Sequence, residues 1–272
     1  MDEGIQGLLF GGEPATAPPS ADPSRAQINL CALNVNSPNQ QRAEAQVSWL
    51  LGTGAEILVL TELQPTSSAR RTIALLDAEG FDVHLGAGWQ DAKYFTAVAA
   101  RRELDTTPGP RAYDPRVVAM RLGNAPGGGH VVGVYGMTNG MTAESSTRRQ
   151  TFQRSLLDYL RTFDATRLCV AGDLNIIEPD HEPPLAAFER HDHDCYTAIV
   201  GLGMRDAYRA QRIGRREHSW HSDFHGSQRL DHAFAGDALG RLADCRYDHV
   251  TRELGLSDHS ALFLRLERPT GA

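Results

Sequence analysis

The chain has 272 residues, of which 41% are hydrophobic and 22% are charged, as is typical of one globular domain. Its net charge of −7 weighs against a protein that is basic throughout, although it does not exclude a basic face for nucleic acid. No apolar run is long enough to span a membrane and no secretory leader is recognisable, so we expect a cytoplasmic, monomeric protein with no membrane partner and with its four cysteines as buried free thiols.

Residues 1–24 are predicted to form a flexible, acidic and proline-rich tail, because they contain four acidic side chains and neither lysine nor arginine. Within it, the segment from Gln6 to Phe10 resembles the peptide by which bacterial repair and replication proteins bind the DNA sliding clamp. Its contacts would come from Gln6, Leu8, Leu9 and Phe10. The alternative is a stray apolar patch. A single catalytic domain is expected over 25–272.

Apolar periodicity along this domain predicts strands interrupted by helices. The predicted helices cover residues 42–51, 67–79, 147–163 and 193–202. The predicted strands cover residues 28–35, 56–60, 81–85, 94–100, 116–122, 130–135, 167–172, 217–221, 229–235, 243–248 and 260–266. Because strands outnumber helices, the pattern favours two packed sheets with helices outside over one parallel sheet.

Polar side chains recur where the predicted strands begin or end. Asn34 and Asn36 close the first strand, although taken alone they are better explained by a simple turn before Ser37-Pro38. Glu62 follows four apolar residues, and the other polar groups stand in Gly172-Asp173-Leu174-Asn175, Arg229-Leu230-Asp231 and Ser257-Asp258-His259. Carboxylate and amide oxygens suit Mg²⁺ or Mn²⁺ better than zinc, which predicts metal-assisted attack of water on a phosphate ester.

The order of these motifs resembles the endonuclease/exonuclease/phosphatase superfamily, and most closely its exonuclease III-like and abasic-site endonuclease members. The resemblance extends over residues 26–268 and includes a tyrosine, Tyr135, between the Glu62 and Gly172 motifs. It implies an α/β fold, a four-layer α/β sandwich of two mixed sheets flanked by helices, with a Mg²⁺-dependent site at one edge.

The resemblance also implies roles for individual residues. The metal would be held by Glu62, Asn36 and Asp258. Catalysis would fall to Asp173 at the attacking water, His259 at the phosphate oxygens, Asp231 as the partner of His259, and Tyr135 and Asn175 near the phosphate. The expected substrate contacts are Asn34, Arg149, Trp220 and Arg229.

The expected function is a Mg²⁺-dependent phosphodiesterase acting on DNA, with abasic-site cleavage in DNA repair as one form of it. Gln228 stands where abasic-site endonucleases often place an aromatic residue, and Leu63-Gln64 replaces a Thr-Lys pair, so abasic-site specificity and the choice between endonuclease and exonuclease stay open. The alternative is a phosphatase for a small phosphorylated metabolite or lipid head group. Near Trp220, the residues His218, His221 and His225 are either a polar loop or substrate contacts.

Overall fold

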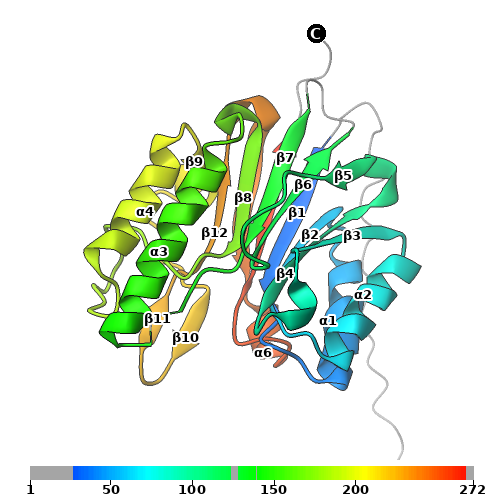
Figure 1. Cartoon of the computed structure of the whole chain (residues 1–272), viewed down its shortest axis with the longest axis horizontal. Helices are drawn as coiled ribbons and strands as arrows, with labels where there is room; N and C mark the ends of the chain where they lie inside the picture. The colour runs from blue at the N-terminus through cyan, green and yellow to red at the C-terminus, as the bar shows by residue number, and fades with distance from the viewer. Residues whose placement is uncertain (1–26, 124–127, 139, 268–272) are drawn as a thin grey trace, which may run out of the picture.

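Two six-stranded sheets pack face to face, and helices cover both outer faces, in the computed structural model of the chain (Figure 1). The structure describes residues 27–123, 128–138 and 140–267. These four layers confirm the predicted α/β sandwich. The predicted tail, with the segment from Gln6 to Phe10, lies outside the described residues.

The first sheet has the strand order β13-β14-β1-β2-β4-β3. Its strands are β1 (Gln27–Asn34), β2 (Ile57–Leu63), β3 (Phe81–Leu85), β4 (Phe95–Arg101), β13 (Arg241–Asp248) and β14 (Ala261–Glu267). Only β1 and β2 pair in parallel, because α1 (Gln40–Gly52) carries the chain from one to the other. The outer face of this sheet is covered by α1 and α2 (Ser67–Ala78).

The second sheet has the order β5-β6-β7-β8-β12-β9. Its strands are β5 (Thr106–Pro108), β6 (Val117–Leu122), β7 (Gly129–Val134), β8 (Leu168–Asp173), β9 (Arg205–Asp206) and β12 (Asp231–Ala235). The helices α3 (Ala143–Leu160) and α4 (Arg190–Gly201) cover its outer face. The remaining short elements are α5 (Ala207–Gln211), α6 (Val250–Glu253) and the 3₁₀ helices η1 (Trp89–Asp91), η2 (Arg102–Leu104), η3 (Ala165–Arg167) and η4 (Asp237–Leu239).

Strand β1 is apolar on both faces because both faces are buried. Ile28, Leu30 and Ala32 point into the core between the two sheets, whereas Cys31 and Leu33 point toward the helices. A strand buried on both faces has no solvent side on which polar residues could alternate. All four cysteines are buried and free, as predicted. No helix in the described ranges has the length and apolarity required to cross a bilayer.

The structure corrects the prediction for residues 217–221. The strand there is β10 (Trp220–Ser222), and it pairs with β11 (Gly226–Gln228) in a separate two-stranded hairpin instead of joining a main sheet. Gly226 permits the tight turn with a φ of +72°. The hairpin and α6 lie at the same end of the sandwich (Figure 1).

Candidate active site

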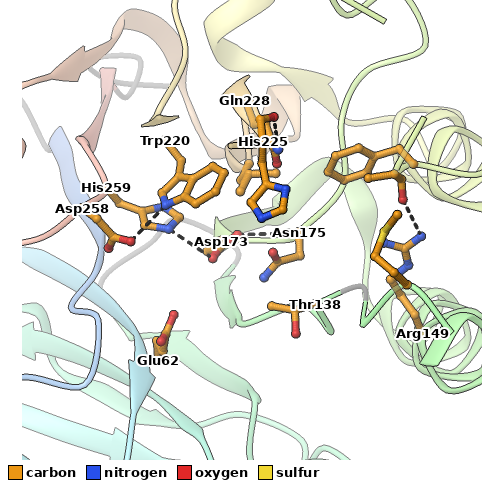
Figure 2. A pocket seen from close by; sticks show the side chains of 14 residues that line it. Glu62, Thr138, Arg149, Asp173, Asn175, Trp220, His225, Gln228, Asp258 and His259 are labelled. Carbon is orange, nitrogen blue, oxygen red and sulfur yellow. Dashed lines mark hydrogen bonds and ion pairs between the residues drawn. The ribbon is translucent and has the colours of Figure 1, made fainter. Parts of the chain in front are cut away.

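Strand ends from both sheets bring most of the predicted polar residues to one edge of the sandwich. In the first sheet, Asn34 pairs in register with Thr61, the neighbour of Glu62. In the second, Asp231 pairs with Asp173 across β12 and β8. A pocket opens at this edge, and the predicted residues that line it are Glu62, Arg149, Asp173, Asn175, Trp220, Asp258 and His259 (Figure 2).

Glu62 is aimed by an irregularity in its strand. The pairing between β2 and β4 shifts register between Leu60 and Leu63, and Glu62 adopts a left-handed φ of 59°. Such a bulge turns a side chain that would otherwise follow the pleat, and a left-handed non-glycine residue is often found at functional sites. The carboxylate therefore projects into the pocket at the end of an otherwise buried strand.

Asn34 links the two carboxylates beneath the pocket. Its Nδ2 lies 3.0 Å from Oε2 of Glu62 and 2.8 Å from Oδ2 of Asp173. The same nitrogen lies 3.4 Å from Nε2 of His259. Because an amide nitrogen carries two hydrogens, Asn34 can donate to both carboxylates at once. Asn34 is thus brought to the site, although it lies below the pocket wall and positions other groups.

Asp173 owes its position to Gly172 and Asn175. Gly172 has a φ of +132°, and a Cβ at this position would lie 2.4 Å from the carbonyl oxygen of Val134, so only glycine fits. The backbone N–H of Asn175 donates to Oδ1 of Asp173 at 3.0 Å, and the side-chain amide of Asn175 donates to the Gly136 carbonyl at 3.2 Å. Both oxygens of the Asp173 carboxylate are therefore fixed by donors.

His259 supplies a positive charge to the site, and the buried carboxylate of Asp231 stabilises that charge. Nδ1 of His259 lies 2.8 Å from Oδ2 of Asp231. Burial opposes protonation of His259, but the charge and hydrogen bond of Asp231 and the nearby Asp173 and Asp258 outweigh it and raise the pKa of His259 to about 9. The imidazolium is thus the stable form at neutral pH.

Two further groups in the site keep their protons more strongly than usual. Burial and the charge of Asp231 raise the pKa of Asp173 above its ordinary value, against the effects of His259 and Asn34. Burial and the charges of Asp173 and Glu62 raise the pKa of Tyr135 well above its ordinary value. A carboxylate with a raised pKa is suited to accept a proton from water.

Trp220 holds the hairpin against the site. Its Nε1 donates to Oδ2 of Asp258 at 2.9 Å, and its ring centroid lies 6.4 Å from that of His259 (Figure 2). The rings of Trp220 and His225 are stacked, with centroids 6.4 Å apart and planes 21° apart. Phe224, at the hairpin turn, is 92% exposed.

The oxygen donors of the pocket fit a hard divalent cation. Among the described residues there is no group of three or more His, Cys, Asp or Glu side chains arranged to hold a metal, which argues against a closed zinc-type cage. Glu62 and Asp258 nevertheless both face the pocket. Mg²⁺ commonly keeps several waters and takes only one or two carboxylates, so this pair would suffice. Asn36 does not line the pocket, and its role as a ligand stays a prediction.

The structure places Arg149 and Arg229, two of the predicted substrate contacts, in buried ion pairs. Arg149 is 1% exposed, and its Nη2 lies 2.6 Å from Oδ2 of Asp192. Arg229 is fully buried, with its Nε 2.5 Å from Glu178 and its Nη2 2.6 Å from Asp206. A guanidinium that is buried and paired with a buried carboxylate is poorly placed to bind a phosphate from solvent.

Several lining residues were not among the predicted site residues. They are Thr138, Met141, Ala187, Phe188, His225, Gln228 and Leu230. Most lie in loops without a motif. His225 gave a signal as one of three histidines close to Trp220, and Gln228 gave one as the residue before the Arg229-Leu230-Asp231 motif. The acidic partners of the two arginines were also missed, because a buried ion pair formed across the fold leaves no local pattern.

Comparison with known proteins agrees with this geometry. A sequence model described as the endonuclease/exonuclease/phosphatase family matches residues 31–259. No curated protein sequence matches the chain.

Solved structures share the fold. An AP endonuclease from Leishmania major has a TM-score of 0.75 at 19% identity, and the match covers 91% of this chain and 90% of that one. A 3′ phosphatase from Neisseria bound to a product DNA hairpin has a TM-score of 0.71 at 22% identity, covering 88% and 99%. An AP endonuclease from Archaeoglobus fulgidus has a TM-score of 0.70 at 18% identity, covering 87% and 98%.

Proposed function

The chain belongs to the endonuclease/exonuclease/phosphatase family and is a phosphoric ester hydrolase, and we propose that its substrate is DNA and its cofactor Mg²⁺, with Mn²⁺ as a substitute. The observation that carries this proposal is the convergence of Glu62, Asp173 and His259 on one pocket, with Asn34 in contact with all three.

The residues divide the work of hydrolysis among them. When bound at Glu62 and Asp258, the metal would supply Lewis-acid stabilisation of charge on the phosphate. Asp173 orients the attacking water and accepts its proton, and the imidazolium of His259 faces the phosphate oxygens, where negative charge accumulates. Asn175 lines the pocket and would border the same phosphate. Tyr135 is 2% exposed and does not line the pocket, so its place near the phosphate stays a prediction. A 3′-oxygen of DNA is the proposed leaving group.

Two exposed apolar side chains beside the pocket support a nucleic-acid substrate. Met141 lines the pocket and is 71% exposed, and Phe224 is 92% exposed on the hairpin that carries Trp220. Large apolar groups left in solvent around a functional cleft commonly mark a binding surface. Stacked bases offer apolar faces to such side chains, whereas a small phosphate ester held in the pocket would not extend to Phe224, which does not line it.

A pair of cations near the site supports a polyanionic substrate. The ammonium of Lys93 lies 5.2 Å from the ring centroid of Tyr94, and the guanidinium of Arg116 lies 5.6 Å from that ring and 5.4 Å from the ring of Tyr135. Within the described ranges, no ion pair joins either cation to a carboxylate. We assign them to the DNA backbone in place of Arg149 and Arg229.

A small phosphate ester is the second candidate, and the charge of the pocket favours it. Three carboxylates, those of Glu62, Asp173 and Asp258, line the pocket, and its one arginine, Arg149, is paired with Asp192. A pocket without a free guanidinium is less suited to a long polyanion. Lys93 and Arg116 do not line the pocket, so a DNA substrate would extend beyond the pocket to reach them, whereas a small ester would not.

The tail suggests a place for the enzyme in DNA repair. Gln6, Leu8, Leu9 and Phe10 resemble a sliding-clamp-binding peptide. A tail that docks in a clamp groove would hold the catalytic domain near DNA at a high effective concentration.

The deciding experiment compares three substrates with and without Mg²⁺: an abasic duplex, a 3′-phosphorylated duplex and a small phosphate monoester. We expect strand cleavage or 3′-phosphate release on DNA, and a loss of about 10²–10⁴-fold for Asp173→Asn with DNA binding retained. Asp158→Asn is the matched control, since Asp158 is exposed on α3 and pairs with Arg161. Turnover of the monoester alone would favour the second candidate, and no turnover of any substrate would contradict both.

A further inference from the structure

His225 has the features of a substrate-binding residue, a role that the family motifs do not include and that the sequence left open between a polar loop and a substrate contact. It follows Phe224 at the turn of the β10–β11 hairpin and lines the pocket with Asp173, Asn175 and His259. Figure 2 shows its imidazole pointing into the pocket beside Asn175.

The backbone of His225 is fixed at both of its polar groups. Its N–H donates to Oγ of Ser222 at 3.2 Å, and its carbonyl accepts from Nε2 of Gln228 at 3.1 Å. Gln228 is buried, so this second anchor belongs to the packed base of the hairpin. An exposed side chain on an anchored backbone can be placed with little loss of conformational freedom.

The imidazole ring is held by stacking and leaves its nitrogens free. It stacks on Trp220, which is itself fixed by its hydrogen bond to Asp258. In the described part of the chain, no protein group pairs with either ring nitrogen of His225. The neighbouring histidines differ, because His221 is bound to Ser227 at 2.7 Å and His218 to the carbonyl of Glu182 at 3.0 Å.

The charges that line the pocket leave a need for a hydrogen-bond donor such as His225. Arg149 is paired with Asp192 and His259 with Asp231, so both cationic side chains of the lining already have carboxylate partners. A phosphate dianion or diester that enters among Glu62, Asp173 and Asp258 needs hydrogen-bond donors on the hairpin side as well. His225 offers one there.

We propose that His225 donates a hydrogen bond to a phosphate oxygen of the bound substrate and so contributes to substrate affinity from the hairpin. The inference rests on the proposed phosphoesterase function and adds a specific contact to it. A contact made equally in the ground state and the transition state raises affinity without changing the chemical step, so its loss is expected in KM and not in kcat.

The test uses the full-length enzyme with Mg²⁺ and the DNA substrate that the wild type turns over. His225→Ala is expected to raise KM, and the inhibition constant of inorganic phosphate, by about tenfold, with kcat within about twofold. His225→Gln retains a donor and should recover most of the affinity. His225→Phe retains the stacked ring without a donor and should behave like His225→Ala.

His221→Ala is the matched control, because His221 lies on the same hairpin and does not line the pocket; its kinetics should equal those of the wild type. Recovery by His225→Phe and not by His225→Gln would overturn the proposal, since the ring would then act by stacking. An unchanged KM in all three variants would also overturn it while leaving the proposed function intact. An inactive wild-type enzyme would instead count against the proposed function.

Discussion

Nδ1 of His259 lies 2.8 Å from Oδ2 of Asp231, and this contact joins the two sheets of the sandwich at the active site. The other oxygen of Asp231, Oδ1, is buried without a hydrogen-bond partner among the described residues, so the carboxylate directs its charge mainly at the imidazole. This leaves Nε2 of His259 toward the pocket, 4.0 Å from Oδ2 of Asp173. The pair therefore fixes both the ring and the proton that faces the substrate.

Asp231→Asn should narrow the pH range of activity. Because Asp231 raises the pKa of His259 to about 9, the imidazolium is present below that pH and is lost as the pH rises through it. Without the carboxylate the pKa falls, and the alkaline limb of the kcat profile should move toward neutral pH. At neutral pH we expect a loss of about tenfold, smaller than the 10²–10⁴-fold expected for His259→Ala. An alkaline limb that stays in place would show that the imidazolium is not required.

Glu62→Gln should weaken metal binding. Removal of one carboxylate charge from an oxygen site is expected to raise the Mg²⁺ concentration for half-maximal activity by at least about tenfold, and chelation should abolish activity of the wild type. Calorimetric titration of Mg²⁺ or Mn²⁺ gives a readout independent of turnover. Glu44→Gln is the control, because Glu44 pairs with Arg71 on the surface. Equal metal affinity in Glu62→Gln and the wild type would remove Glu62 from the ligand set.

Arg116→Ala should reduce the salt dependence of DNA binding. Each phosphate contact that is lost lowers the slope of log K against log salt by about one unit on a duplex. The measurement is a fluorescence-anisotropy titration on an uncleaved duplex at several salt concentrations without added metal. Arg154→Ala, on the exposed face of α3, should leave the slope unchanged. A slope equal to that of the wild type in Arg116→Ala would place the DNA backbone elsewhere.

Arg229→Met should affect stability and not DNA binding. The change leaves the buried Asp206 without its arginine and leaves the buried Glu178 with Arg209 alone, which is expected to cost about 3–5 kcal/mol in the free energy of unfolding. Burial alone would raise the pKa of Asp206, but the charge of Arg229 outweighs it and holds that pKa well below its ordinary range. A carboxylate whose pKa is lowered in the folded state stabilises the fold at pH values above its pKa in the unfolded chain. This stabilisation is lost as the pH falls through the folded-state pKa.

The difference in the free energy of unfolding between the wild type and Arg229→Met should therefore be largest at neutral pH and shrink below about pH 4. Urea unfolding at several pH values measures it. A reduced salt slope of DNA binding in a folded Arg229→Met protein would restore Arg229 as a substrate contact.

Those parts of the site that depend on a local sequence pattern could be predicted from the sequence. Glu62 and Asp173 each follow a run of buried strand residues, so their place at a strand end could be predicted. An arginine gives no such signal, because the same local pattern fits a surface cation and a buried one. Arg149 is paired with Asp192, 43 residues away, and Arg229 with Glu178, 51 residues away. Only the packed fold reveals these partners.

Leu9→Ala combined with Phe10→Ala should abolish binding to the sliding clamp of the same organism. An apolar pair beside the amide of Gln6 suits a hydrophobic groove with a polar rim, and a short isolated peptide is expected to bind with a Kd of roughly micromolar. Calorimetric titration of a peptide of residues 1–14 into the clamp measures this affinity. Hydrolysis by the variant in the absence of the clamp should equal that of the wild type, because the site residues all lie beyond residue 33. A peptide that does not bind the clamp would contradict the assignment, as would equal clamp affinity of the variant and wild-type enzymes.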